Sequence, residues 1–408
     1  MENVKDQPQS TKNVLAVATM SHMSQHLYMG ASVLYPSIMA SLQLSYSEIG
    51  LAVSVGSILA GFLQLMMSIL SRYVPRRIIL GFGNLLYAAA EYGTGLSRNF
   101  IQLFSANLLG GIGQAVQHPI GVSIVSDKYR EGSVGGALGL FYGVAYAGNI
   151  VGPIVLAVLA TAFGWRSSLY LFALAPALIG VYLMIHLRGE RSAGKTFKQV
   201  SLRKDVSSAF HVKSAVAVIL SQSLFAGGTG MGALVIYTPL FLANQVHLST
   251  LDVGAFFSIM MLGGVIGPLL IGRYSDRVGH LESAIVCTFA AALLVYLLPI
   301  HTVSSSTMVL HLFMLGISGF PATSLLQAHL SKVAAPSERD ILLGLFFTIG
   351  YGFSSVWSAV MGIVIQTYGS FKPAYVLMAA LALIGTLPLF YTKLTRGRPA
   401  ALDLSARC

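Results

Sequence analysis

The sequence predicts an all-α membrane protein of about twelve transmembrane helices, arranged as two pseudo-symmetric six-helix bundles. This fold class rests on the composition, on the number and length of the apolar runs, and on an internal repeat. Of the 408 residues, 55% are hydrophobic and only 10% are charged. A chain of this composition cannot form a soluble surface of ordinary polarity, so an integral membrane protein is expected.

The apolar runs give the order of the predicted helices. Each is long enough to cross roughly 30 Å of hydrocarbon at about 20 residues per span. The polar segment 1–13 leads into the first run without a small-residue cleavage site, so that run is predicted to be a retained helix rather than a signal peptide. The runs lie near 14–40, 47–70, 77–97, 100–126, 135–162, 166–187, 214–243, 251–272, 281–300, 306–333, 340–366 and 371–392.

The basic residues predict how the helices are oriented, because Lys and Arg concentrate in the cytoplasmic loops of membrane proteins. With the amino terminus inside, all of the 25 lysines and arginines except Arg98, Arg166 and Lys372 fall on the cytoplasmic side. The sequence therefore predicts a multi-pass protein of the cell (inner) membrane with both termini in the cytoplasm. The net charge of +11 does not indicate nucleic-acid binding, because the basic residues fall between apolar runs rather than along one face.

An internal repeat divides the chain into two halves. The predicted organisation is a six-helix bundle over 1–187, a basic cytoplasmic linker over 188–213, and a second bundle with a short cytoplasmic tail over 214–408. The linker could bind anionic membrane lipid, or it could be a solvated connection that follows the orientation rule. A shift of 205 residues superposes, without gaps, Gly111 on Gly316, Gly139 on Gly344, Gly164 on Gly369 and Tyr170 on Tyr375.

The fifth apolar run contains a seam of small residues that ends in a proline. Gly139 is followed nine residues later by Gly148, and then by Gly152 and Pro153. Small residues allow membrane helices to approach closely, and the proline bends the helix. This spacing resembles the fifth-helix signature of the major facilitator superfamily, particularly its antiporter branches. A leucine and an alanine at 156–157 stand where that family often has two further glycines.

The loops after the second helix of each half carry a second resemblance. The sequence GRYSDRVGH over 272–280 closely resembles the superfamily's cytoplasmic loop motif, whereas the amino half has a serine and a valine where the family usually has Asp and Gly. In that family the motif locks neighbouring helices in one conformation; the alternative is that the arginines only set the topology. The candidate latch residues are Arg72, Arg76, Asp276 and Arg277.

The same resemblance implies that spans 1, 4, 7 and 10 line a central cavity between the two bundles. His22, Gln25 and His26 fall at i, i+3 and i+4 and share one helix face, and the fourth span repeats this spacing. Polar side chains inside membrane helices indicate a substrate path. The candidates for substrate binding or proton coupling are His22, Gln25, His26, Tyr28, Tyr35, Gln114, Gln117, His118, Gln222, Tyr237, His311 and Gln327.

Two stretches, 21–36 and 111–119, look like the fosmidomycin-resistance branch of the superfamily. The first helix of that branch tends to carry His and Asp four residues apart before a Tyr, and its fourth helix a Gly-rich run into His-Pro. This chain keeps His22 and His118 but has His26 where the branch has Asp.

Titratable groups inside the spans indicate how transport could be coupled to protons. Glu91 is the one acidic residue well inside a predicted span, which makes it a candidate proton carrier or a structural carboxyl. Imidazole titrates near pH 6.5 when unperturbed, so His22, His26 and His118 are either proton-coupling groups or hydrogen-bonded packing groups. A cavity of imidazoles, amides and tyrosines suits a neutral or anionic solute better than a cation.

These observations predict a secondary active transporter that works by alternating access, most simply as proton-coupled efflux of a small organic solute. Uptake of an organic anion or metabolite by a symporter or exchanger is the alternative, followed by a membrane-embedded enzyme. No GxxxxGK[ST] loop is present, and the Gly-rich run at 227–232 fits helix packing or a bend, so no cofactor is expected. No HExxH pattern completes a metal site around His22 and His26, and a monomer is expected.

Overall fold

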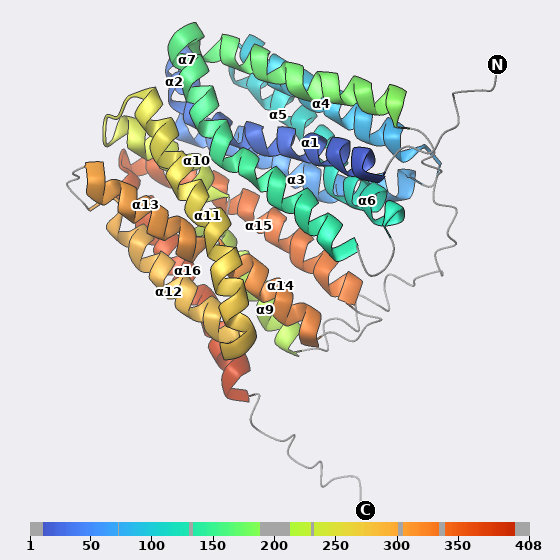
Figure 1. Cartoon of the computed structure of the whole chain (residues 1–408). Helices are drawn as coiled ribbons and strands as arrows, with labels where there is room; N and C mark the ends of the chain where they lie inside the picture. Colours follow the sequence, from blue (N-terminus) through green and yellow to red (C-terminus); the bar gives the residue numbers. More distant parts are fainter. Residues whose placement is uncertain are drawn as a thin grey trace, which may run out of the picture.

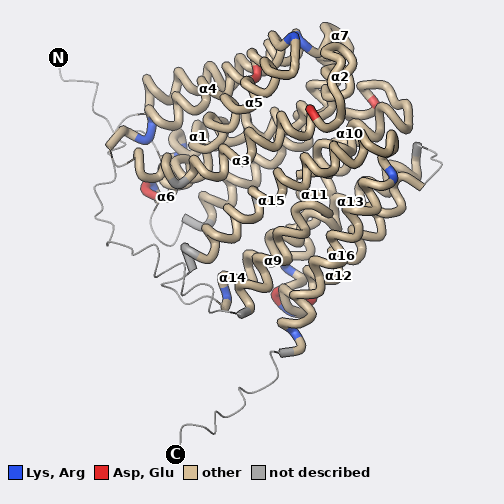
Figure 2. The backbone as a smooth tube through the Cα atoms, turned by 180° about the vertical axis from the view of Figure 1, so that it is seen from behind, with Lys and Arg blue, Asp and Glu red and all other residues tan. Residues whose placement is uncertain are grey.

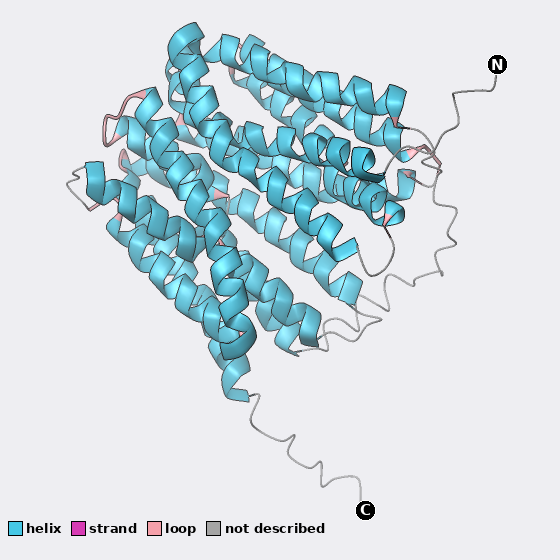
Figure 3. Ribbon diagram, in the orientation of Figure 1, coloured by secondary structure: helices cyan, strands magenta, loops and turns pink. Residues whose placement is uncertain are grey.

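The computed structural model describes residues 11–71, 73–129, 134–187, 213–229, 232–300, 305–333 and 339–395. Over these ranges every regular element is a helix, as Figure 3 shows, which confirms the all-α fold class. The predicted latch residue Arg72, nearly all of the linker 188–213 and both chain ends lie outside the described residues.

The amino-terminal helices follow the first six predicted runs, with breaks that the runs did not indicate. The first run bends at a short 3-10 turn over Gly30–Leu34. In the fourth run a π-helical turn surrounds Pro119, which lacks the N–H that a regular α-helix would bond. The elements are α1 (Thr11–Met29), η2 (Gly30–Leu34), α2 (Tyr35–Leu42), α3 (Tyr46–Leu70), α4 (Arg76–Leu96), α5 (Phe100–Gln114), η3 (Gln117–Gly121), α6 (Val122–Lys128) and α7 (Val134–His186).

The carboxy-terminal helices follow the other six predicted runs. The seventh run is divided between α9 and α10, and the tenth between α13 and α14, where Pro321 begins the second helix. The elements are α9 (Lys213–Gly228), α10 (Ala233–Asn244), α11 (Thr250–Val278), α12 (His280–Leu297), α13 (Ser305–Gly319), α14 (Pro321–Val333), α15 (Arg339–Tyr368) and α16 (Phe371–Thr395).

Eight helices of the described chain are long and apolar enough to cross a membrane, judged by length and composition alone. The segment Gly136–His186 counts once among them, although it covers two predicted runs and breaks at Gly164. α1 and α4 are not among the eight because their several polar side chains lower their hydropathy. α5 is not among them because it is only 15 residues long, since η3 interrupts the fourth run.

The helices pack as two groups that follow the chain (Figure 1). In the amino-terminal group α7 packs against α1 and α4, and α5 against α3 and α4; in the other, α16 packs against α9 and α12, and α11 against α13. The groups meet through α3 with α15 and through α7 with α11. The boundaries 1–187, 188–213 and 214–408 stay a prediction.

The predicted repeat has a counterpart in the backbone. Gly164 and Gly369 are both left-handed, with φ of 81° and 61°, a region that favours glycine. A methyl group added at Gly111 would lie 3.0 Å from the Gly56 Cα, and one added at Gly316 would lie 2.9 Å from the Gly264 N. In each half the second and fourth helices therefore approach each other closely at a glycine of the fourth helix.

The halves contact each other at one end of the bundle, which we call the closed end and which contains the turns 43–45, 245–249 and 369–370. The Tyr46 N–H donates to Gln366 Oε1 at 3.2 Å, the Asn244 amide donates to the Tyr46 hydroxyl at 2.9 Å, and the Tyr46 ring packs on Phe371. Within the carboxy-terminal half, the fully buried Tyr237 hydroxyl donates to the Ser358 carbonyl at 2.7 Å, and a methyl group added at Gly50 of the other half would meet this hydroxyl.

The other end, which we call the basic end, contains residues 73–75 and the ends of α6, α14 and α16. Lys and Arg gather towards α6 and α14 in Figure 2. A methyl group added at any of five glycines in the first parts of α7 and α15 would meet no atom within 4 Å: Gly136, Gly139, Gly143, Gly344 and Gly352. These faces are unpacked, unlike Gly50 and Gly362 near the closed end, where an added methyl group would meet the Tyr237 hydroxyl.

Tyr46→Phe is expected to weaken the closed end. The variant keeps the ring that packs on Phe371 but removes the hydroxyl that accepts from the Asn244 amide of the other half, at a cost of about 1 kcal/mol, so conformers open at this end should become about fivefold more populated. Spin labels at Gln43 and Gln245, in a background without native cysteines, would report a larger share of long distances. Tyr73→Phe is the matched control because Tyr73 is 79% exposed, and an equal change in both variants would contradict this role of Tyr46.

Candidate functional site

Three histidines from two helices meet inside the amino-terminal group. His22 and His26 lie one turn apart on α1, and their Nε2 atoms are 3.1 Å apart. The His118 ring, from η3, lies 5.1 Å from the His22 ring in an edge-on orientation. The π-helical turn at Pro119 positions this third imidazole. We call these three residues the histidine cluster.

One face of α7 forms an aromatic wall against the histidine cluster. Phe141 stacks on His22 with ring centroids 4.5 Å apart, and Tyr146 meets His26 edge-on at 4.8 Å. Tyr142 lies 5.3 Å from the His22 ring. Aromatic walls of this kind provide apolar contact area together with hydroxyl groups that bond polar ligands.

The contact with Asn149 determines which ring nitrogens of His22 and His26 carry a hydrogen. His26 Nδ1 lies 2.9 Å from Asn149 Oδ1, so with this amide assignment Nδ1 carries the hydrogen. A neutral His26 then accepts a hydrogen bond at Nε2 from the Nε2–H of His22. Because a neutral imidazole carries one hydrogen, Nδ1 of His22 has none, and its lone pair is the remaining acceptor of the histidine pair. That nitrogen is buried and makes no hydrogen bond of normal geometry among the described residues, and the backbone of Phe141 is the polar group near the ring. A proton or a substrate hydroxyl can therefore bind to it.

A buried hydrogen-bond network connects α1, α4 and η3 beside the cluster. The Ser21 hydroxyl donates to Gln117 Oε1 at 2.8 Å and accepts from the Asn84 amide at 2.8 Å. The Gln25 carbonyl accepts from the Tyr87 hydroxyl at 3.4 Å. In the described chain the Nε2 atoms of Gln25 and Gln117 are buried without partners, which provides two further donors for a ligand.

The remaining sequence candidates do not all join this site. Gln114 is half-buried one turn before η3, and the Tyr28 ring packs edge-on against Tyr87. His311 Nε2 donates to the Leu294 carbonyl of α12 at 2.8 Å, so its ring lies against a neighbouring helix of its own half. Tyr35 is partly buried at the start of α2, and Tyr237 belongs to the closed end.

In the carboxy-terminal half, Gln222 Oε1 accepts from the Thr323 hydroxyl at 3.3 Å, which joins α9 to α14. Gln327 is half-buried one turn further along α14. A methyl group added at Gly350 would lie 3.1 Å from the Gln222 Cγ, so this glutamine lies close to α15 as well.

Sequence reasoning missed the partners that α4 and α7 supply. The signal was available as helical spacing, since Tyr142, Tyr146 and Asn149 fall at i, i+4 and i+7 on α7. Asn84 and Tyr87 begin a similar stripe on α4. Spacing shows which side chains share a face, but it does not show which neighbouring helix that face contacts.

The glycine seam allows α1 and α7 to approach closely. A methyl group added at Gly148 would lie 2.9 Å from the Leu27 N, and one added at Gly152 would lie 2.8 Å from the Leu27 carbonyl carbon. Gly30 lies against Pro153 in the same way. Gly139 does not take part, because a methyl group there would meet nothing within 4 Å. The close approach brings Asn149 within reach of His26.

The candidate latch residues differ between the halves. Arg76 is buried and forms an ion pair with Asp127 at the end of α6. In the other half the Asp276 carboxylate is 74% exposed and lies 4.0 Å from His280 Nε2. The structure thus gives Arg76 a partner in the amino half, whereas Asp276 has a weaker contact next to Arg277.

Removing Asp127 is expected to cost more stability than removing Arg76. Asp127→Ala leaves a guanidinium whose side chain is only 7% exposed without its anion, at a cost of about 3 kcal/mol. Arg76→Met leaves a carboxylate that is 53% exposed and stays hydrated, so about 1 kcal/mol or less is expected. Thermal unfolding of the purified variants in detergent measures both, and equal losses would contradict the burial argument.

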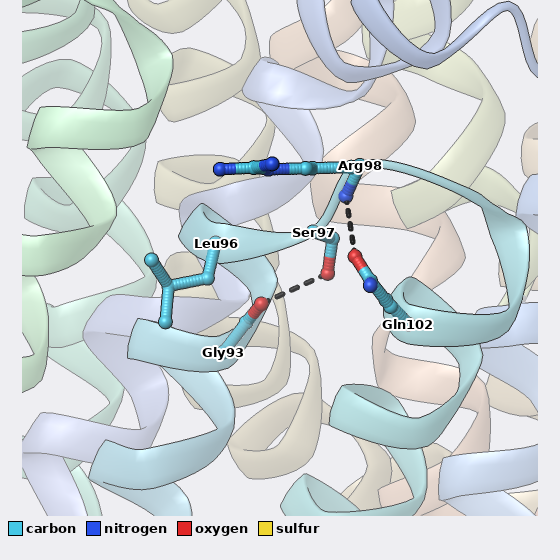
Figure 4. Close-up of a pocket in the computed structure, with 5 residues that line it drawn as sticks. All are labelled: Gly93, Leu96, Ser97, Arg98 and Gln102. Atoms are coloured by element: carbon cyan, nitrogen blue, oxygen red, sulfur yellow. Dashed lines mark hydrogen bonds between the residues drawn. The ribbon is translucent and has the colours of Figure 1, made fainter.

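A pocket of about 270 Å³ lies at the turn between α4 and α5, away from the histidine cluster (Figure 4). Its polar atoms bond one another: the Ser97 hydroxyl donates to the Gly93 carbonyl and the Arg98 N–H to Gln102 Oε1, both at 2.8 Å. It therefore offers few free groups to a ligand. Within the described ranges no group of three or more His, Cys, Asp or Glu is placed to hold a metal ion.

A family model described as the Major Facilitator Superfamily matches residues 15–359. The chain belongs to the major facilitator superfamily. It is therefore a multi-pass membrane transporter of small organic solutes and not an enzyme, because the family and the relatives it matches are transporters. The resemblance predicted from the fifth helix and from the loop motif is confirmed at the level of the superfamily.

Among relatives in the superfamily, the chain is 24% identical over 386 residues to the probable L-galactonate transporter of Escherichia coli (strain K12), covering 88% of this chain and 84% of that one. It is 23% identical over 390 residues to the fosmidomycin resistance protein of the same strain, covering 92% of each. This similarity agrees with the predicted resemblance to the fosmidomycin-resistance branch.

Solved structures of the superfamily share the fold. A mutant of the nucleoside transporter NupG superposes with a TM-score of 0.80 at 15% identity, covering 94% of this chain and 99% of that one. A bacterial homolog of the human lysosomal transporter Spinster, in an inward-facing and occupied conformation, gives 0.75 at 16% identity, covering 96% and 98%.

Proposed function

We propose that this superfamily member is a proton-coupled secondary transporter that moves a small neutral or anionic organic solute by alternating access, in the direction of efflux. The observation that carries the proposal is the histidine cluster, in which His22 and His26 share a hydrogen bond beside the aromatic wall of α7. Imidazoles bind and release protons without requiring a permanent charge in the membrane.

The chemistry of the cluster supports a neutral or anionic solute. Its groups are imidazoles, amides and tyrosine hydroxyls, and a proton taken up at His22 Nδ1 would create a positive charge that attracts an anion. Relatives are named as transporters of L-galactonate and of 4-methylmuconolactone, an anion and a lactone. Solutes of these two kinds are therefore the first to test.

Alternating access gives the two ends of the bundle their roles. Contacts between the halves at the closed end, and unpacked glycine faces at the basic end, support a conformation that opens towards the basic end. With the orientation that the basic loops predict, that side is the cytoplasm. The proposed setting is a monomer in the inner membrane, with Arg76 and Arg277 acting as latches at the cytoplasmic end.

Proteoliposomes that contain the purified protein and a pH-sensitive dye test the coupling. We expect galactonate, a lactone or a nucleoside to evoke proton movement, and we expect none with the lipophilic cation tetraphenylphosphonium. Transport of the cation alone would overturn the solute assignment. Solute transport without proton movement would overturn the coupling.

Uptake of the solute is the second candidate. The same cycle runs in either direction, according to the gradients of solute and proton. Cells that carry the gene and are preloaded with a labelled solute distinguish the two. Faster loss of label than in cells without the gene supports efflux, whereas faster accumulation from the medium supports uptake.

A further inference from the structure

We propose that Glu91 and the tyrosines around it form a second proton-binding site, joined to the histidine cluster by a polar seam between α1 and α4. The role of this site in transport rests on the proton coupling proposed above. The existence of the site is independent of that coupling, because it is argued from burial and from hydrogen bonding alone.

The seam consists of one polar face of α4 against α1. Asn84, Tyr87, Glu91 and Thr94 fall at i, i+3, i+7 and i+10, which places them on one side of the helix, and all four are buried. At one end of the seam the Asn84 amide donates to Ser21, the residue before His22. At the next turn Tyr87 donates to the carbonyl of Gln25, the residue before His26. Polar groups thus continue from the histidines to Glu91.

Glu91 lies at the far end of this seam without a partner for its charge. Its side chain is 1% exposed, and within the described chain neither carboxyl oxygen has a hydrogen-bond partner. An ionised carboxylate in such a place costs several kcal/mol, whereas a carboxylic acid carries no charge to desolvate. The position therefore binds a proton, which the membrane-spanning helices shield from both aqueous sides.

The groups that face Glu91 accept or donate protons. Tyr28 and Tyr87 lie within electrostatic range of the carboxyl, with their rings edge-on at 5.4 Å, and Tyr35 lies near both tyrosines. His22 and His26 follow on α1, and His118 on η3. On α7 the nearest cation is Arg166, which donates to the carbonyls of Gly95 and Ser97 at 2.6 and 2.7 Å. Its charge therefore caps the end of α4 instead of neutralising Glu91.

The oxygen atoms of this site are also ligands that a sodium ion would accept. We favour the proton because the seam leads to imidazoles, which titrate near neutral pH and bind protons as the Glu91 carboxyl does. The pocket of Figure 4 is not its entrance, because Glu91 is not among the residues that line it.

Infrared difference spectroscopy of the purified protein across a pH step tests the site directly. We expect a carbonyl band of a buried carboxylic acid in the wild type and its loss in Glu91→Gln. Glu48→Gln is the matched control, since Gln keeps the capping bond from the Ser45 N–H and the band should persist. Absence of the band from the wild type, or its persistence in Glu91→Gln, would overturn the proposal. Because no substrate is needed, this result is independent of the transport assay.

The role in transport is tested by the number of protons moved per substrate in proteoliposomes. We expect Glu91→Gln to lower this ratio and Glu48→Gln to leave it unchanged. An equal ratio in Glu91→Gln and wild type would overturn the transport role of the site. Solute movement driven by a sodium gradient at constant pH, and lost in Glu91→Gln, would overturn the proton assignment in favour of sodium. A wild type that moves no protons would instead overturn the proposed coupling, while the infrared band would still decide whether Glu91 holds a proton.

Discussion

Gly152→Val is expected to abolish transport and to destabilise the amino-terminal helices. The new side chain would enter the backbone of Leu27, whose carbonyl carbon and Cα lie 2.8 and 3.0 Å from an added Cβ. Backbone cannot rotate away as a side chain can, so α1 and α7 must separate, at a cost of about 3 kcal/mol. The separation would also pull Asn149 from His26, because the two helices present these residues to each other.

Thermal unfolding and transport of purified Gly152→Val measure both effects. Gly139→Val is the matched control on the same helix, because its Cβ would meet no atom within 4 Å. That variant should keep the stability of the wild type within about 0.5 kcal/mol. Comparable losses of stability and transport in the two variants would contradict the argument that the close approach of α1 and α7 at Gly152 causes the effect.

His26→Ala is expected to lower substrate-evoked proton movement by about tenfold or more. The variant removes the hydrogen bonds to His22 and to Asn149, each worth about 1 kcal/mol, and with them one of the two imidazoles that share a proton. Solute binding through Tyr142 and the aromatic wall should decrease less than proton movement.

The dye assay in proteoliposomes, with the solute found to be transported, measures this loss. His247→Asn is the control, because it removes an exposed imidazole at the closed end and Asn tolerates the positive φ of 61° there. Proton movement at the wild-type rate in His26→Ala would refute a coupling role for the histidine pair and leave Glu91 as the candidate.

The order of the helices could be predicted from the sequence because hydrocarbon thickness sets the length of each apolar run. The breaks at Gly30–Leu34 and Gln117–Gly121 could not, since a run remains apolar whether its helix is straight or bent. The bend at η3 nevertheless matters for function, because it positions His118 beside His22.

The candidate site was partly predictable. The spacing of His22 and His26 places them on one face, and their ring nitrogens are in contact in the structure. His311 is also a polar residue on a predicted cavity helix, yet it donates a hydrogen bond to the Leu294 carbonyl of α12. A polar residue on such a helix can face any neighbouring helix, so its position in the sequence does not show that it faces the cavity. Asn149 and the aromatic wall of α7 were not predicted, since the fifth helix was considered only for its glycines.

The contacts at the two ends of the bundle should respond differently to dissolved salt. At the closed end the halves are joined by hydrogen bonds between neutral groups, such as Tyr46 with Gln366 and Tyr46 with Asn244. Ions at about 0.15 M screen exposed charges beyond roughly 8 Å but leave neutral hydrogen bonds nearly unchanged. At the basic end the Arg76–Asp127 pair has a half-exposed carboxylate that ions can reach. Closure at the closed end would therefore be nearly independent of the ionic strength on that side of the membrane, whereas the contact between α4 and α6 at the basic end would weaken as the ionic strength of its compartment rises.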